Sequence, residues 1–326
     1  MKRWAILFHP YGIKNPKSSG TGLRFAAAMA LALFVISFSG KAAWFTNGAS
    51  ADAFVRALAP NSNYGGAGAL SVAGPSAVNG SGVTNGVFDS FIRFNTGAMV
   101  TNFNALYGTN NWVITAAKLQ VTEMGAPPNA VFNRGVGGFE IRWIVNDNWI
   151  EGTGTPNAPT TNGVAYKDET SLLNSQTDVS LGTFTNAGID TTLSFQLTLP
   201  PAFIQDASAG GEVGLYWKAI DPRIGFTVDS RSFGTASALP YLEISALPAP
   251  GISSIELSGA DVILSGTNGA AGGTYLVLDS PSSTSPLGQW VPIATNVLSA
   301  SGPFTFVLTN SANGALGAQF FAIKAQ

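Results

Sequence analysis

Asp147 and Glu151, which lie on either side of Trp149, are the residues of this sequence best suited to breaking a chemical bond. Two carboxylic acids hydrolyse a glycosidic bond when one protonates the leaving group and the other acts as base or nucleophile. The alternative is structural: Trp149 packs under a loop with its N–H hydrogen-bonded, and Glu151 accepts hydrogen bonds from the backbone or from an arginine. Arg93 and Arg231 are the candidates for that arginine. We expect Trp149, Glu151, Arg93 and Arg231 to stabilise the fold, and we keep a two-carboxylate enzyme as an alternative.

The amino-acid composition argues against most other catalytic mechanisms. The chain has no cysteine and one histidine, His9, in a segment that we expect to be removed. The mature chain would therefore lack the imidazole and thiolate groups that such nucleophilic mechanisms need. It would also lack the Cys and His ligands on which zinc sites rely. A calcium-binding site remains an alternative, because Asp52, Asn61 and Asn63 offer oxygen ligands. Their spacing matches no calcium-loop pattern, and turn capping by the same residues is the alternative. We expect no cofactor, with calcium as the open alternative.

Residues 1–42 have the sequence pattern of a signal peptide. Residues 1–24 contain five cations and no acid, and residues 25–38 form an uncharged apolar run of 14 residues. That run is shorter than the roughly 20 residues of a membrane-spanning helix, so we expect cleavage after Ala42 and no stable membrane span. The mature chain would keep 10 Lys and Arg against 18 Asp and Glu, which disfavours nucleic acid as a partner. We expect a secreted or cell-surface protein.

Short runs in which apolar and polar residues alternate dominate the mature sequence. The clearest are residues 88–94, 117–122, 139–145, 193–199, 213–217 and 224–228. Asn-Gly pairs, which favour tight turns, occur between such runs. The pattern predicts an all-β fold, a jelly-roll-like antiparallel β-sandwich in which one face of each strand meets the core and the other is wetter. We expect only short helices, one spanning Met99 to Leu106 and one opening at Pro200-Pro201 and ending at Gly210.

The prolines at 248 and 250 indicate a linker at residues 247–251, because proline restricts the backbone and cannot donate in a central strand. Residues 43–246 are ample for one sandwich, and residues 252–326 are enough for a small second β-sandwich-like module. We expect strands in that module at 254–258, 261–265, 274–279, 290–295, 304–309 and 319–323.

Eight short motifs follow one another between residues 50 and 246. They are Ala51-Asp52-Ala53-Phe54-Val55, Asn61-Ser62-Asn63-Tyr64-Gly65, Phe91-Ile92-Arg93-Phe94-Asn95, Ile114-Thr115-Ala116-Ala117-Lys118-Leu119, Trp149-Ile150-Glu151-Gly152, Thr177-Asp178-Val179, Ser230-Arg231-Ser232 and Pro240-Tyr241-Leu242-Glu243-Ile244. In order and spacing they resemble the DNRLRE-domain family, secreted β-sandwich modules related to carbohydrate-binding modules. Asn95 departs from the family pattern, which commonly has an acid there.

The C-terminal residues carry a second set of motifs: Gly266-Thr267-Asn268-Gly269, Tyr275-Leu276-Val277-Leu278, Pro286-Leu287-Gly288-Gln289-Trp290, Ala294-Thr295-Asn296 and Gln319-Phe320-Phe321. This string is similar to a small module common in secreted proteins of Verrucomicrobia-type bacteria. That resemblance implies export and no particular activity.

We look for ligand-binding residues on the faces of the strands that we expect to be wet. Arg142, Tyr216 and Lys218 lie in strands, and Lys167 and Arg223 lie in loops. Cations beside a flat aromatic suit an acidic polysaccharide, because a carboxylate meets the charge while the ring stacks on a sugar face. The DNRLRE resemblance implies the same, since some relatives bind alginate-like polymers through basic residues. Against this idea stand the acidity of the mature chain and the ordinary alternative of a solvated face.

These observations favour a secreted or cell-surface, non-catalytic protein that binds polysaccharide or mediates adhesion. Its expected partner is an extracellular or cell-wall polysaccharide, or a neighbouring surface protein. One alternative is a structural subunit or spacer of an extracellular assembly, joined through exposed sheet edges. The other is a polysaccharide-cleaving enzyme that uses Asp147 and Glu151.

Overall fold

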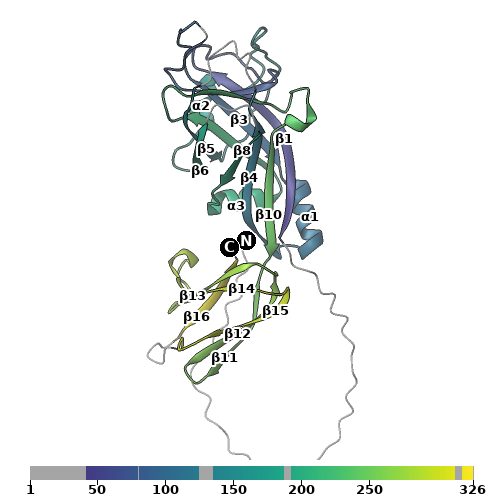
Figure 1. Cartoon of the computed structure of the whole chain (residues 1–326), viewed down its shortest axis with the longest axis vertical. Coiled ribbons are helices and arrows are strands. Elements are labelled where there is room, and N and C mark those ends of the chain that lie inside the picture. Colours follow the sequence, from purple (N-terminus) through teal and green to yellow (C-terminus); the bar gives the residue numbers. More distant parts are fainter. Residues whose placement is uncertain (1–41, 80, 125–134, 187–191, 313–317, 326) are drawn as a thin grey trace, which may run out of the picture. The chain divides into compact units, whose positions relative to one another are not determined.

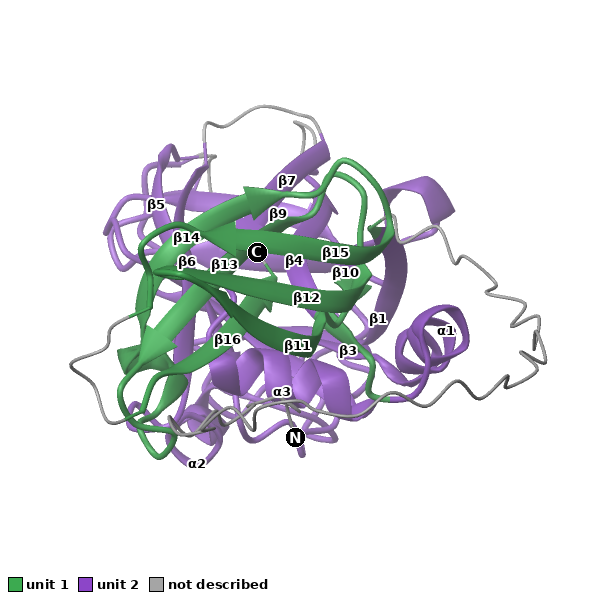
Figure 2. Cartoon of the chain, turned by 90° about the horizontal axis from the view of Figure 1, so that it is seen from below, with its two compact units in different colours: residues 1–42, 110–113, 247–326 green, residues 43–109, 114–246 purple. Residues whose placement is uncertain are grey.

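The computed structural model describes residues 42–79, 81–124, 135–186, 192–312 and 318–325, so the predicted signal peptide lies outside the described residues except for Ala42 (Figure 1). The chain divides into two compact units (Figure 2). Unit 2 comprises residues 43–109 and 114–246, and unit 1 contains residues 110–113 and 247–326. Each unit is all-β with antiparallel strand pairing, as the alternating runs predict.

The described residues of unit 2 form ten strands in two layers. The layer that we call sheet A has the order β1-β10-β4-β7, with β1 Ala43–Arg56, β10 Tyr241–Pro248, β4 Trp112–Thr122 and β7 Thr192–Leu197. The layer that we call sheet B has the order β6-β5-β8-β3-β1, with β6 Val179–Asn186, β5 Gly137–Ile144, β8 Glu212–Ala219 and β3 Phe88–Asn95. The short strands β2 Ala69–Ala73 and β9 Gly225–Asp229 extend sheet B through the pairing of β2 with β3.

Strand β1 belongs to both layers. Its first half, Ala43 to Gly48, pairs with β10, and its second half, to Arg56, pairs with β3. The register shifts between Ala49 and Ala51, where a bulge interrupts the ladder. A bulge bends a strand and increases its twist, which allows one long strand to leave one sheet and enter the other.

Aromatic side chains join the inner faces of the two sheets. The ring of Phe195 on β7 lies 5.3 Å from that of Phe139 on β5 and 6.4 Å from that of Trp217 on β8, both edge-on. Phe139 and Trp217 are completely buried. Edge-to-face contacts at these distances are favourable beyond the area that they bury. The two layers therefore form a sandwich with an aromatic core.

The expected short helices are present. Helix α1 spans Gly97–Tyr107, and α3 spans Pro201–Ala209 and ends at Gly210, whose φ of 83° is the left-handed conformation that glycine tolerates. A helix of four residues, α2 Glu169–Leu172, was not expected. Three 3₁₀ turns are η1 Tyr166–Asp168, η2 Ala236–Ala238 and η3 Leu287–Gln289. Within the ranges that the structure describes, no helix is long and apolar enough to cross a membrane.

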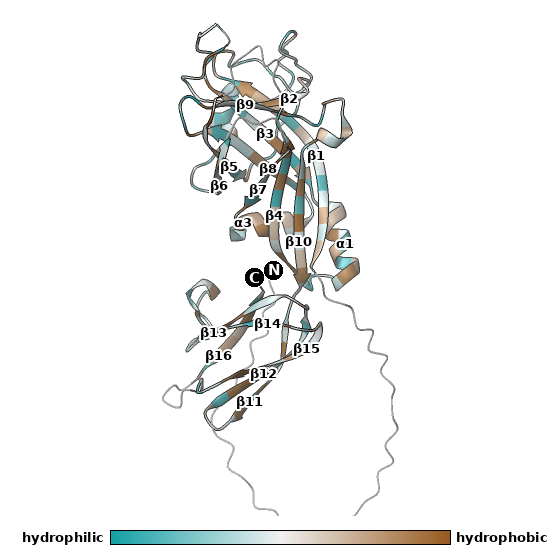
Figure 3. Ribbon diagram, in the orientation of Figure 1, coloured by the Kyte–Doolittle hydropathy of each residue, from teal (hydrophilic) through white to brown (hydrophobic). Residues whose placement is uncertain are grey.

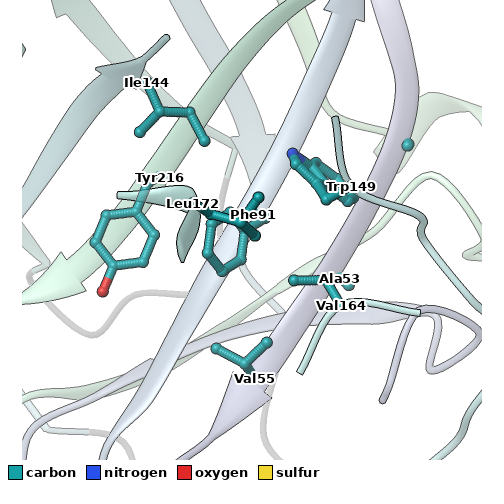
Figure 4. Packing of buried hydrophobic residues seen from close by; sticks show 9 residues of the cluster. Ala53, Val55, Phe91, Ile144, Trp149, Val164, Leu172 and Tyr216 are labelled. Atoms are coloured by element: carbon teal, nitrogen blue, oxygen red, sulfur yellow. The ribbon is translucent and has the colours of Figure 1, made fainter. Parts of the chain in front are cut away.

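The outer face of sheet B is covered, which corrects the expectation of a wet face there. Phe91 and Asp89 on β3 alternate with core residues, yet both are buried. The segment 145–178 crosses this face and contributes Trp149, Val164 and Leu172 to one cluster with Phe91. Figure 4 shows the Phe91 ring between those of Tyr216 and Trp149. The part of the outer face of sheet B around Phe91 is therefore buried and apolar, whereas Glu140, Arg142 and Lys218 on the same face form ion pairs.

Unit 1 is a smaller sandwich of two three-stranded sheets. One has the order β11-β12-β15, with β11 Gly251–Ser258, β12 Asp261–Gly269 and β15 Gly302–Leu308. The other has the order β14-β13-β16, with β14 Val291–Val297, β13 Thr274–Ser280 and β16 Phe320–Ala325. All six expected strands are found. The segment between the strands of the two units is shorter than the linker expected at residues 247–251, because β10 continues to Pro248 and β11 begins at Gly251.

Candidate functional site

Glu151 is held by Arg231 in a two-point ion pair. The Nε and Nη2 atoms of Arg231 donate to the two carboxylate oxygens of Glu151 at 2.8 and 2.6 Å. The backbone N–H of Asp52 also donates to Glu151, and the backbone N–H of Arg231 donates to the Asp52 carboxylate at 2.7 Å. Burial raises the pKa of Asp52 to about 7. Both oxygens of Glu151 are therefore occupied in the manner of a structural anchor.

Arg93 fixes the start of the segment that covers sheet B. Its Nη1 atom donates to the backbone carbonyls of Asp147 and Trp149, and its guanidinium lies 4.8 Å from the centroid of the Trp149 ring. Trp149 is buried, as expected. Its ring N–H finds no acceptor among the described residues, unlike the hydrogen-bonded N–H that we expected. Packing and the cation above the ring hold this side chain in place.

Asn63 ties the same covering segment to the loop before β2. Its Nδ2 atom donates to the carbonyls of Glu151 and Val164, at 2.6 and 2.9 Å, and its Oδ1 atom accepts from the backbone N–H groups of Gly65 and Gly154. A Cβ at Gly154 would lie 1.9 Å from the Asn63 carbonyl oxygen, so only glycine fits. The amide of Asn63 is thus committed to the fold.

The three candidate calcium ligands are not brought together as a ligand set. Asp52 and Asn63 are buried and bonded to the backbone, whereas Asn61 is exposed in a turn. In the described part of the chain, no three or more His, Cys, Asp or Glu side chains are grouped as a metal site would require.

The described contacts of Asp147 and Glu151 lead to different partners and do not join the two residues. Its backbone carbonyl accepts from Arg93, and burial raises the pKa of its carboxyl. Glu151 is engaged with Arg231.

A second pair of acids joins sheet B to the segment that covers it. Asp89 on β3 and Glu169 on α2 share a hydrogen bond, and the hydroxyl of Tyr216 lies 3.2 Å from Glu169 Oε1, to which it donates. Burial and mutual repulsion raise the pKa of Glu169, and burial raises that of Asp89 despite the cation of Lys218. Such a pair is stable when it retains a proton. Sequence reasoning missed this pair, because α2 has no periodic signal.

The predicted ligand-binding residues are placed differently from what we expected. Tyr216 is 4% exposed and belongs to the cluster under the covering segment, so its ring offers no free face. Arg142 and Lys218 do lie together, but Glu140 pairs with both, at 3.0 and 3.3 Å. Lys167 in η1 and Arg223 between β8 and β9 are exposed on other segments. The structure therefore does not assemble the five residues into one surface.

Burial by itself would raise the pKa of Glu140. The hydrogen bond with Ser180 and the charges of Arg142 and Lys218 outweigh it and lower this pKa below its ordinary value. Arg142 also donates to the backbone carbonyl of Asp178 at 2.7 Å. The cations on this part of sheet B are thus used within the protein.

The outer face of sheet A is the open, polar face of unit 2. Figure 3 shows hydrophilic and hydrophobic residues alternating along β1, β4 and β10. Trp44 and Thr46 on β1 are exposed and lie beside Ser245 and Glu243 on β10. The other outward side chains are Lys118, Gln120 and Thr122 on β4, Tyr241 on β10, and Thr192, Ser194 and Gln196 on β7. The Trp44 side chain at one end of this face is 52% exposed.

A continuous chain of contacts crosses this face. Tyr241 donates its hydroxyl hydrogen to Gln120, and the amide of Gln120 donates to Glu243 at 3.4 Å. Glu243 pairs with Lys118 at 2.5 Å, and the Lys118 ammonium lies 5.6 Å from the centroid of the Trp44 ring. The face therefore presents an exposed aromatic ring beside ordered amide, hydroxyl and carboxylate groups.

Comparisons with known proteins give no assignment. No protein-family model and no curated protein matches the chain. Among solved structures, the chain is similar to a beta-1,2-glucanase from Parabacteroides distasonis, with 12% sequence identity and a TM-score of 0.20. The match covers 88% of this chain and 34% of the glucanase chain, so this chain spans about a third of that structure's length. At this similarity the match carries no argument about function.

Proposed function

We propose that this is an exported, non-catalytic protein that binds polysaccharide on the outer face of sheet A. The observation that carries the proposal is the exposed ring of Trp44 beside hydrogen-bonding side chains on a sheet face. A sugar ring has an apolar C–H face that packs on an aromatic ring, and its hydroxyls both donate and accept hydrogen bonds. The signal-peptide pattern of residues 1–42 supports export, and the resemblance to the DNRLRE-domain family supports glycan binding.

The acidic residues support contact rather than bond cleavage. Both carboxylate oxygens of Glu151 accept from Arg231, and Asp89 on β3 shares a hydrogen bond with Glu169 of the covering segment. A general acid must reach the leaving oxygen of a bound substrate, and an anchor of this kind is directed into the fold.

Affinity electrophoresis of the purified protein through gels that contain single polysaccharides tests this proposal. We expect retarded migration in at least one polymer and no release of reducing ends. Normal migration in every polymer would refute glycan binding. Reducing ends that appear with the wild type and disappear with Glu151→Gln would instead establish the enzyme alternative.

A further inference from the structure

On the outer face of sheet A, Lys118 and Glu243 form an ion pair. We propose that this face selects uncharged polysaccharides and rejects acidic ones, an inference that rests on the proposed function. The cation and the anion that project from its central strands are Lys118 on β4 and Glu243 on β10, and they form an ion pair with an N–O distance of 2.5 Å. An acidic polymer needs a cation that is free to meet its carboxylates.

Lys118 is engaged on two sides. Its ammonium contacts the Glu243 carboxylate and lies over the ring of Trp44. The side chains of Lys118 and Glu243 are 28% and 21% exposed, so the pair is partly shielded from water. A uronate that approached Lys118 would have to displace Glu243 or bind beside its negative charge. Both routes cost free energy, because like charges repel and the displaced carboxylate loses its partner.

Uncharged groups supply the rest of the surface. Gln120 is oriented at both ends of its amide, by Tyr241 and by Glu243. Thr46, Ser194 and Gln196 are exposed on the flanking strands. Hydroxyls and amides both donate and accept, which suits the hydroxyls of a neutral sugar and gives a carboxylate no compensating charge. Because the contacts around Gln120 fix its position, less conformational freedom is lost when a ligand binds.

The cations of sheet B do not offer an alternative binding site for an acidic polymer. Arg142 and Lys218 share Glu140, and Arg142 also donates to the backbone of Asp178. Both cations are therefore engaged by groups within the protein, as Lys118 is. The predicted mature chain has 10 Lys and Arg against 18 Asp and Glu, so long-range repulsion acts against a polyanion as well.

Affinity electrophoresis in two sets of gels tests the inference. The neutral set contains mixed-linkage β-glucan, xylan or galactomannan, and the acidic set contains alginate or polygalacturonate. We expect retardation in at least one neutral polymer, unchanged in about 1 M sodium chloride, where charges are screened beyond about 3 Å. We expect no retardation in the acidic set.

Three variants assign the effect to this face. Trp44→Ala should weaken neutral binding about tenfold, whereas Ile150→Ala, which truncates a side chain 71% exposed elsewhere in unit 2, should leave it unchanged. Glu243→Gln removes the partner of Lys118, so this variant should gain binding to alginate that is lost in about 1 M salt.

Salt-sensitive binding of the wild type to acidic polymers and not to neutral ones would overturn the inference and leave polysaccharide binding standing. Neutral binding that Trp44→Ala does not weaken would overturn the inference and also the placement of the site on the outer face of sheet A. A wild type that binds no polymer in either set would refute the proposed function itself.

Discussion

Replacing Glu169 by glutamine should make the stability of unit 2 less sensitive to pH. In the wild type, Glu169 on α2 lies against Asp89 and Tyr216, with the charge of Lys218 nearby. As the pH rises, the second carboxyl of the pair loses its proton, and two negative charges then lie side by side between sheet B and the covering segment. Glutamine keeps a hydrogen-bonding oxygen for Tyr216 and can donate to Asp89, and it never ionises.

The sign follows from the direction of the pKa shift. Burial and the charge of Asp89 raise the pKa of Glu169 from 4.5 to about 8. The folded protein therefore binds this proton more tightly than the unfolded chain. The associated stability is fully present below about pH 4.5 and is lost as the pH rises through about 8. Tyr166, which also faces the two acids, has its pKa raised by burial and by their charge, so it stays neutral over this range.

The expected size is modest. A shift from 4.5 to about 8 corresponds to at most ~5 kcal/mol, at about 1.4 kcal/mol for each pKa step. Glu169 is only partly buried, so solvent screens its charge and reduces the effect. We expect the wild type to lose ~1–2 kcal/mol between pH 5 and pH 9 through this group. Glu169→Gln should then be more stable than the wild type by about that amount at pH 9, and about equal to it at pH 5.

Urea unfolding at several pH values, followed by tryptophan fluorescence, measures this difference. Glu256→Gln is the matched control, because Glu256 is an exposed acid on β11 and its removal should leave the pH dependence of unit 2 unchanged. Asp52 and Asp229, whose pKa values burial raises to about 7 and about 6, contribute a separate slope that both variants keep. The reasoning fails if Glu169→Gln and the wild type unfold with the same pH dependence.

Three further substitutions test the contacts that hold the fold. Arg231→Gln should lower the free energy of unfolding by ~2 kcal/mol in urea denaturation, because it leaves Glu151 unpaired; an unchanged midpoint would contradict this. Asn63→Ala should cost ~2–3 kcal/mol and accelerate limited proteolysis within residues 151–164, and equal proteolysis would show that the loop is held by other groups. Tyr275→Phe should cost ~1 kcal/mol by thermal unfolding, because the backbone N–H of Ala270 loses its acceptor; a stability equal to that of the wild type would argue against that bond.

Period-two alternation predicted the strands well because it reports local geometry. Val262 and Leu264 on β12 point into the core of unit 1, as their alternation requires. The same holds for the helix that begins after Pro200 and ends at Gly210, since its signals lie within its own sequence. These elements are specified by residues near one another in the chain, so a single sequence is enough to find them.

The covered face of sheet B was not predicted, because the segment that covers it has no regular period. Its apolar members, Trp149, Val164 and Leu172, are widely spaced among polar and turn residues. One signal was present: Phe91 lies at a position that alternation assigns to the wet side, between Asp89 and Arg93. A large apolar residue at such a position indicates that something packs over the strand. The burial of Tyr216 follows from the same cover.

The ligand class that we propose rests on strand order and register, which the sequence alone does not reveal. Alternation places Lys118 and Gln120 on the outward side of β4, but Glu243 is 123 residues from Gln120 in the sequence and reaches them only because β10 lies between β1 and β4. In the sequence, the cations Arg142 and Lys218 near the aromatic Tyr216 favoured an acidic polymer. Binding depends instead on the cations that remain unpaired once the strands are side by side, and on this face the Lys118 charge is already balanced by Glu243. The neutral ligand that we propose therefore rests on residues other than the five that the sequence indicated, because only the strand order brings Lys118 and Glu243 together.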